Sequence, residues 1–176
     1  MIKTIATGLA IVIGILLLYA ATRPDAFRIQ RSATIRAPAE KIHPLISDMR
    51  RFNSWNPYNK KDPNAKGTYR GPAAGPGAGY DFEGNKDVGK GSIQIVEPVT
   101  PTRVSMKLDM LEPFEAHNQV EFTLAPRGDS TEVTWAIHGP SPFMTKLMGI
   151  FFDMDRMIGR DFEAGLADLK AAAERS

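Results

Sequence analysis

Histidines are the side chains best suited to proton transfer and metal binding near neutral pH, and this sequence has three, His43, His117 and His138. None has a histidine partner at HExxH or HxH spacing, so we expect no metal site. His117 and His138 fall on the polar faces of alternating segments, and His43 lies between apolar positions of a short helix. The sequence has no cysteine, which excludes disulfides, thiolate nucleophiles and cysteine-bound metals.

Two further kinds of catalytic motif are missing from the sequence. No serine lies in a G-x-S-x-G string, which argues against a hydrolase triad on a nucleophile elbow. Segment 71–79 (GPAAGPGAG) is rich in glycine, but no helix follows it, and Gly91 separates Lys90 from Ser92 where a phosphate loop needs them adjacent. We therefore expect a flexible loop, at the mouth of the ligand cavity that is described below. We expect no cofactor.

An acid–base residue inside an apolar cavity would be a polar side chain among inward-pointing apolar ones. Tyr80, Asp109 and Asn118 are the few candidates. We assign catalysis to none of them. The catalytic residues are therefore unknown, and the sequence leaves open whether the protein is an enzyme.

Seven segments with alternating apolar and polar residues predict antiparallel strands, beginning with Phe27–Ala37. Two short helical segments follow, one opened by Pro38 and one over residues 50–55, and then a polar loop over 56–64. The other six strands are separated by turns rich in Gly, Pro or Asp. They are Gly67–Gly71, Gly79–Glu83, Gly91–Glu97, Arg103–Met110, Phe114–Ala125 and Thr131–Gly139.

The last segment, Ser141–Ser176, has apolar residues three or four positions apart, as on one stripe of a helix. Ser141 and Pro142 fit an N-cap followed by the first helical residue. A helix from there to Glu174 is ~45–50 Å long, so it must lie along a large apolar surface. Gly159 favours a break in this helix. The break would leave Ser141–Ile158 as a mobile segment over the mouth of a ligand cavity.

This order of elements predicts an α+β helix-grip fold, in which a curved seven-stranded antiparallel sheet wraps a long C-terminal helix. Such a sheet cannot close flush onto a straight helix, so we expect an apolar ligand cavity between them. Its expected lining consists of inward-pointing strand residues, an aromatic residue of the second short helix and part of the helix stripe. These residues are Trp55, Tyr80, Phe82, Met106, Leu108, Phe122, Trp135, Phe151, Met154 and Ile158.

Residues 5–21 (IATGLAIVIGILLLYAA) form an uncharged run at the short end of what spans a bilayer. An uncleaved membrane anchor is the first interpretation. A cleaved signal peptide is the second, although Tyr19–Thr22 has no clean small-x-small cleavage site. A buried soluble helix is disfavoured because the run has no polar face. We divide the chain into a tail (1–4), a transmembrane helix (5–21), a linker (22–26) and one domain (27–176).

The charges around this run give opposing indications of its orientation. Arg23, Arg28, Arg31 and Arg36 follow it and favour a cytoplasmic domain. Charges on a folded domain count less than those in short loops, however, and a short tail carrying Lys3 tends to stay inside. On balance we expect a single-pass membrane protein with an extracytoplasmic domain.

Four strings resemble the START-like superfamily, also called SRPBCC, at its polyketide cyclase/dehydrase-type branch. They are residues 35–42 (IRAPAEKI), 48–57 (DMRRFNSWNP), 84–91 (GNKDVGKG) and 131–135 (TEVTW), and the likeness covers residues 28–173. The first two strings are typical of the fold and say little about chemistry. The resemblance implies binding of a lipid, sterol, polyketide or other hydrophobic molecule. Members also include cyclases, hydratases and co-chaperones, so the fold does not specify one function.

The combined prediction is a membrane-anchored domain that binds a hydrophobic small molecule, lipid-like or polyketide- or isoprenoid-like, in the sheet–helix cavity. A cyclase- or dehydrase-type enzyme acting on a hydrophobic substrate is the alternative, and a protein-interaction module without a ligand is the third hypothesis. The N-terminal helix makes the lipid bilayer a predicted partner. The net charge of +2 gives no field that indicates nucleic acid.

Overall fold

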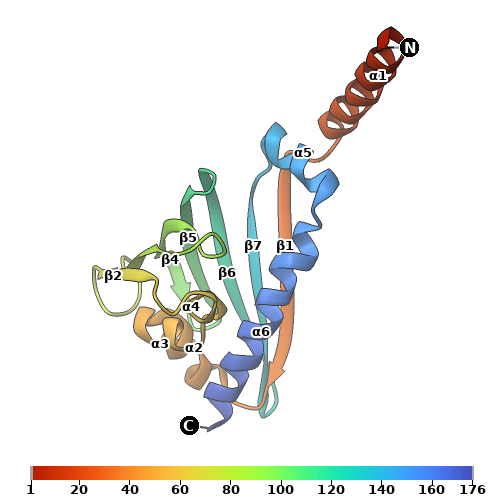
Figure 1. The fold of residues 1–176 in the computed structure, drawn as a ribbon. Helices are drawn as coiled ribbons and strands as arrows, with labels where there is room; N and C mark the ends of the chain where they lie inside the picture. Colours follow the sequence, from red (N-terminus) through yellow and green to blue (C-terminus); the bar gives the residue numbers. More distant parts are fainter. Residues whose placement is uncertain (1, 176) are drawn as a thin grey trace.

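An antiparallel sheet of seven strands is the main element of the structure, a computed structural model that describes residues 2–175. Its order is β1-β7-β6-β5-β4-β3-β2, so the first and last strands of the chain are neighbours (Figure 1). The strands are β1 (Ala26–Ile35), β2 (Lys66–Arg70), β3 (Gly79–Glu83), β4 (Lys90–Thr100), β5 (Arg103–Glu112), β6 (Ala116–Arg127) and β7 (Ser130–Pro140). The helices are α1 (Ile2–Ala21), α2 (Ala39–Ser47), α3 (Met49–Trp55), α4 (Pro57–Lys61), α5 (Phe143–Phe151) and α6 (Met154–Arg175).

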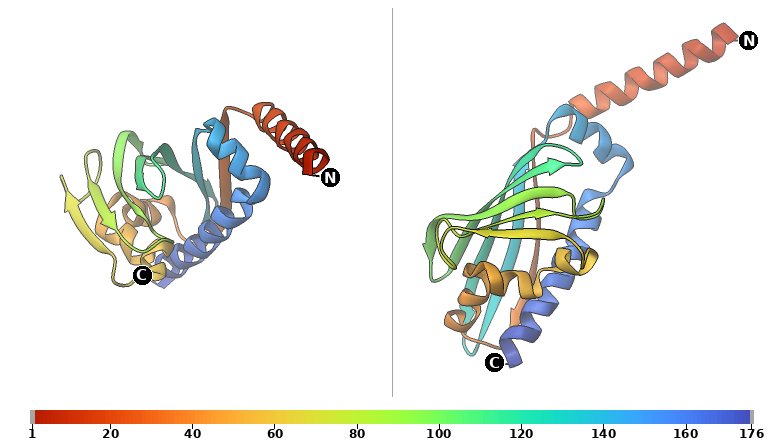
Figure 2. Two further views of the ribbon diagram at one scale, coloured as in Figure 1. Left: turned by 45° about the horizontal axis from the view of Figure 1, so that its top comes forward. Right: turned by 60° about the vertical axis from the view of Figure 1, so that its left-hand side comes forward.

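The sheet curves around α6, which lies along β1 on the concave side, and α2, α3 and α4 pack against α6 (Figures 1 and 2). The predicted helix-grip fold is therefore confirmed. Each predicted strand is present. Gly79–Glu83 has the predicted bounds, and the other six differ at one or both ends by one to three residues, because alternation defines the middle of a strand better than its ends.

The C-terminal helix is broken, but the predicted place of the break was wrong. It lies between α5 and α6, where Asp153 accepts a hydrogen bond from the Arg156 amide at 2.9 Å and caps the new helix. The predicted Ser141 cap was also wrong, since Pro142 precedes the first turn of α5 and no side chain caps it. An aspartate three residues before the amide that it caps is the signal that sequence reasoning missed.

Gly159 lies inside α6, where it makes room for an arginine from the sheet. A β-carbon at this position would collide with the guanidinium of Arg31, which projects from β1. Arg31 pairs with Asp155 at 2.9 Å and with Glu163 at 2.9 Å, one on each side of the glycine. The missing side chain of Gly159 therefore leaves a notch for the guanidinium of Arg31, which holds α6 against β1. The helix is not interrupted at this glycine.

The predicted loop over residues 56–64 contains α4, so this prediction was wrong. The helix begins after Asn56, whose side chain accepts a hydrogen bond from the Tyr58 amide at 3.2 Å. Pro57 occupies its first position, where the missing backbone N–H costs nothing. The asparagine and proline that indicated a loop therefore start a short helix.

The glycine-rich loop, which the sequence predicts as a flexible loop at the cavity mouth, lies against α2 and α3. The Met49 amide donates to the Ala73 carbonyl at 3.2 Å, and the Gly75 amide donates to the Ser47 carbonyl at 2.9 Å. Gly75 has a φ of +77°, which glycine adopts without strain. The glycines therefore let the loop follow the surface of the helices.

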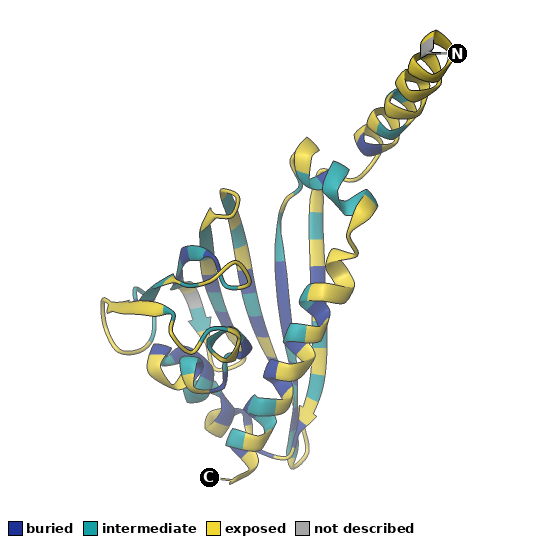
Figure 3. Cartoon of the chain, viewed as in Figure 1, coloured by how far each residue is buried: buried dark blue, intermediate teal, exposed yellow. Residues whose placement is uncertain are grey.

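Helix α1 extends away from the domain, and residues 3–13 are all exposed (Figure 3). Among the residues that the structure describes, one helix, Lys3–Ala21, is long and apolar enough to cross a membrane. Its last turn packs against α5, where Ala20 is buried. The helix already includes residues 2–4 of the predicted tail, and residue 1 lies outside the described residues.

Candidate functional site

An aromatic cluster fills the space between the sheet and the middle of α6. Trp135 of β7 stacks on Phe162 of α6 with ring centroids 4.1 Å apart, and it lies 5.0 Å from Phe122 and 5.6 Å from Trp55. The Trp55 indole N–H donates to the Leu45 carbonyl at 2.8 Å, which fixes that ring. These rings are core residues, and we call this part of the fold the closed end.

Burial decreases along α6 from its C-terminus toward its N-terminus. Leu169, Leu166 and Phe162 are 0–2% exposed, whereas Ile158 is half-buried and Met154 is 40% exposed. The same concave face is therefore covered by a helix at one end and less covered at the other.

The inner faces of β5 and β6 show the same gradient of burial. Met106 is fully buried, whereas Leu108 and Met110 further along β5 are half-buried. On β6 the half-buried inner residues are Ala116 and Asn118, which pair with Met110 and Leu108. We call this half-exposed region the open end, and it lies toward α1 because β5 ends there and β6 and α6 begin there (Figure 3).

The ten predicted cavity residues are divided among three parts of the structure. Trp55, Met106, Phe122 and Trp135 lie in the closed end. Tyr80, Phe82, Leu108 and Ile158 are half-buried, and the strand register places the first three at the open end. Phe151 and Met154 are exposed beside the turn between α5 and α6. The structure therefore does not bring the ten residues into one site.

Two of the predicted polar candidates share the open end. The register aligns Tyr80, Leu108 and Asn118 in one row across the sheet. The Asn118 amide lies over Gly139, whose missing side chain leaves room for it. Burial, and after it the neighbouring Tyr69, raises the pKa of the Tyr80 hydroxyl, so this group stays protonated at neutral pH and can donate a hydrogen bond.

Asp109, the third polar candidate, lies on the opposite, convex face of the sheet. Its carboxylate is 2.6 Å from Nδ1 of His117 and 2.9 Å from Nζ of Lys107. A hollow of about 360 Å³ next to it has Asp81 in its wall, but that carboxylate pairs with Arg70 at 2.7 Å. Within residues 2–175, no three His, Asp or Glu side chains are placed to hold a metal.

The contact between His117 and Asp109 predicts a shifted histidine titration. The hydrogen bond to Asp109 raises the pKa of His117, so the stabilisation from this contact is complete below the ordinary value of ~6.5 and is lost as the pH rises through the folded value. We expect a pKa above the ordinary value in an NMR titration, and Asp109→Asn should lower it. An unchanged His117 pKa in that variant would show that the contact does not form.

A second hollow, of about 600 Å³, lies between the start of β1, α5 and the turn before α6. Phe151 and Met154 line it, with Phe27 and Ile150 beside them. Lys146 also lines it, and its buried ammonium group pairs with the carboxylate of exposed Asp25. Sequence reasoning missed this lysine, because a single lysine on a helix is usually solvated.

The comparisons with known proteins agree with this architecture. A family model described as "Polyketide cyclase / dehydrase and lipid transport" matches residues 26–174. A search of curated proteins finds no match.

Solved structures share the fold at low sequence identity. A protein of Thermobifida fusca is 24% identical, with a TM-score of 0.61, over 84% of this chain and 93% of that one. Protein CV1439 from Chromobacterium violaceum is 16% identical, with a TM-score of 0.58, over 86% and 99% of the two chains. Ara h 8.0201 is 9% identical, with a TM-score of 0.56, also over 86% and 99%. These similarities show the fold.

Proposed function

Because the chain belongs to the polyketide cyclase/dehydrase and lipid transport family, we propose that it is a membrane-anchored domain that binds an apolar small molecule at the open end of its sheet. The gradient of burial carries this proposal. Apolar side chains on the concave face are fully covered at the closed end, whereas Leu108, Met110 and Ile158 remain half-exposed. Covering ~300 Å² of apolar ligand surface would contribute about 7–8 kcal/mol before the costs of binding.

The polar groups of the open end favour binding over acid–base catalysis. Asn118 does not titrate, and the raised pKa of Tyr80 keeps its hydroxyl protonated at neutral pH. Each can form a hydrogen bond with a polar group of a ligand, Tyr80 from β3 and Asn118 from β6, but neither is a base at this pH. The expected ligand is therefore largely apolar, with one or two hydrogen-bonding groups.

The features of α1 support its role as an anchor. Its 20 residues span ~30 Å, which equals the thickness of a bilayer core. Tyr19 and Arg23 lie at its domain end, and the Arg23 guanidinium is 5.7 Å from the centre of the Tyr19 ring. Tyrosine and arginine are preferred where a helix leaves the hydrocarbon for the headgroups.

Photo-cross-linking of the full chain in lipid nanodiscs tests the binding proposal. The probe is a fatty acid that carries a diazirine, and mass spectrometry locates the labelled peptide. We expect label on the segment that contains Leu108 and Met110, and native mass spectrometry from mild detergent should show a retained apolar ligand.

Leu108→Trp should fill the open end and reduce that label about tenfold, a change of ~1.4 kcal/mol in binding. Lys107→Trp is the matched control, since it places the same ring on the neighbouring residue of the convex face. Label found on α1 alone would contradict the proposal. Equal labelling of the two tryptophan variants would also contradict it, provided that both have normal thermal stability.

A further inference from the structure

Exposed large apolar side chains are gathered at one end of the domain. Among the described residues that follow α1, all such side chains except Tyr69 lie on the β5–β6 hairpin, on α5, in the turn after α5 or at the start of α6. The rim that we define here consists of Leu111, Phe114, Phe143, Met144, Phe151 and Phe152, which are 46–66% exposed. A soluble surface rarely gathers so many large apolar side chains, so this rim needs a partner.

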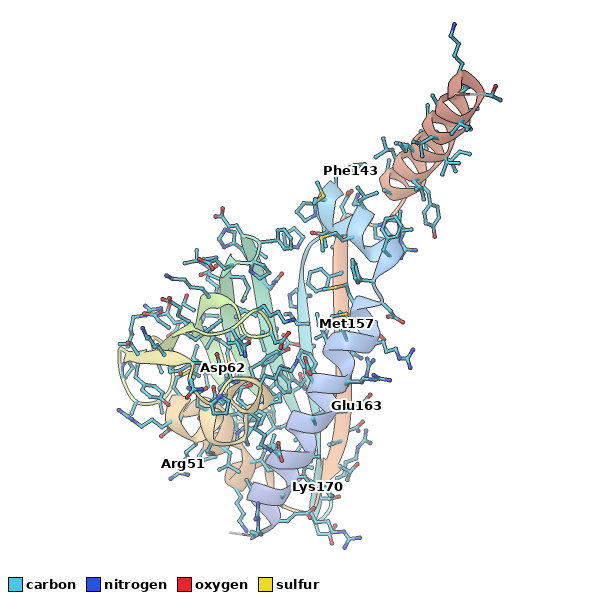
Figure 4. All side chains as sticks on the ribbon, viewed as in Figure 1. Arg51, Asp62, Phe143, Met157, Glu163 and Lys170 are labelled. Atoms are coloured by element: carbon cyan, nitrogen blue, oxygen red, sulfur yellow. The ribbon has the colours of Figure 1, made fainter. Side chains whose placement is uncertain are left out.

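The rim lies beside the open end and next to the anchor. The hairpin with Phe114 and helix α5 stand at the same end of the molecule as α1, at the top of Figure 1. Phe143 marks this end in Figure 4, and Met157 lies further along the C-terminal helix. Met154 and Met157, 40% and 57% exposed, continue the apolar surface from the rim along α6 toward the open end.

We propose that the rim is a second membrane-contact surface, which sets the open end of the sheet against the phospholipid bilayer that α1 crosses. This inference rests on the anchor assignment of the proposed function. The hairpin and α5 would enter the headgroup region on two sides of the opening. An apolar ligand would then pass between the bilayer and the concave face without crossing water.

The position of α1 favours the bilayer over a soluble protein as the partner. The short connection from Ala21 to Ala26 keeps the domain within a few residues of the membrane surface, which gives the rim a high effective concentration of lipid. Rim helix α5 is also the element against which the last turn of α1 packs. The bilayer is therefore the apolar phase that this surface meets first.

The charges around the rim indicate that apolar burial, and not attraction to acidic lipids, drives this contact. Glu112 and Glu115 flank Phe114 on the hairpin. On α5, the ammonium group of Lys146 is buried and paired with Asp25. No excess of cations accompanies the aromatic side chains of these two elements, so zwitterionic lipid should suffice.

Single-cysteine labelling of the full chain tests this inference, and the absence of natural cysteines makes each label unique. Phe114→Cys and Phe151→Cys report on the two sides of the rim, and Ala171→Cys is the control at an exposed position near the C-terminal end of α6, opposite the rim (Figure 1). Each variant carries an NBD fluorophore in phosphatidylcholine nanodiscs that contain lipids with a nitroxide on the acyl chain. We expect blue-shifted, strongly quenched emission at both rim positions and unquenched emission at Ala171→Cys.

The possible outcomes separate the bilayer from other partners. Quenching that is unchanged when phosphatidylglycerol is added supports apolar insertion, whereas quenching that requires phosphatidylglycerol would overturn the apolar mechanism. Water-like emission at both rim positions would overturn the membrane contact itself. A nitroxide attached at position 114 instead of NBD tests for a second copy of the chain. Dipolar broadening that is lost on dilution with unlabelled chain, together with no lipid quenching of NBD, would identify that copy as the partner.

The same measurements distinguish failure of this inference from failure of the proposed function. If the rim labels are solvated while the diazirine probe still marks the Leu108 segment, the domain binds its ligand without resting on the bilayer. If the rim is quenched and the segment is unlabelled, the membrane contact stands and the binding proposal fails.

Discussion

Replacing Trp135 with alanine should lower the free energy of unfolding by about 3–5 kcal/mol, the range for removal of a large aromatic side chain from a core. Trp135 is 3% exposed and contacts Trp55, Phe122 and Phe162 from three other elements. No neighbour can fill the resulting space without leaving its own ring contacts. Urea unfolding in mild detergent, followed by far-UV circular dichroism, measures the effect.

Two further variants separate packing from polar effects at this position. The Trp135 indole N–H is buried without a hydrogen-bond partner among the described residues, so Trp135→Phe removes an unsatisfied donor and keeps a ring. Its loss of stability should be much smaller than that of Trp135→Ala. Thr134→Ala, on the convex face, should change stability by less than ~1 kcal/mol. Equal effects for the two alanine variants would contradict a packed closed end.

Gly165→Ala should destabilise the fold, although alanine is the better helix former by about 1 kcal/mol. A β-carbon at position 165 would lie 2.6 Å from Cζ3 of Trp135 and 2.9 Å from Cδ of Pro57. Both neighbours belong to rigid rings in the core, and overpacking of this kind costs about 1–3 kcal/mol. We expect a net loss of unfolding free energy and a lower midpoint in the same urea experiment.

Gly149→Ala is the matched control for this prediction. It lies in α5, where an added β-carbon would meet nothing within 4 Å, so the substitution should stabilise the chain by about 0.5–1 kcal/mol. The difference between the two glycine variants isolates the clash, because helix propensity contributes to both. A stabilised Gly165→Ala would show that α6 lies further from Trp135 than in this structure.

The two ends of the concave face have different roles because of how they are covered. The closed end has the aromatic cluster and the packed half of α6, and its variants report on stability. The open end has half-exposed Leu108 and Met110 beside Asn118, so substitutions there should affect binding with a smaller effect on folding.

The sequence by itself determined the order of the strands and the fold. Alternation of apolar residues placed all seven strands, and the helical stripe of the last segment identified the helix that the sheet wraps. These patterns are local, since a side chain's face depends only on the period of its own element. The uncharged run before the domain identified α1 in the same way.

The division of the concave face into a closed and an open end was decided by the tertiary structure. Trp55, Leu108 and Phe151 have equally apolar side chains, yet they are buried, half-buried and exposed, because burial depends on which distant element covers each one. The notch at Gly159 likewise depends on Arg31, more than a hundred residues earlier. Periodicity specifies the face on which a side chain lies, and only the packing of elements far apart in the chain decides what that face meets.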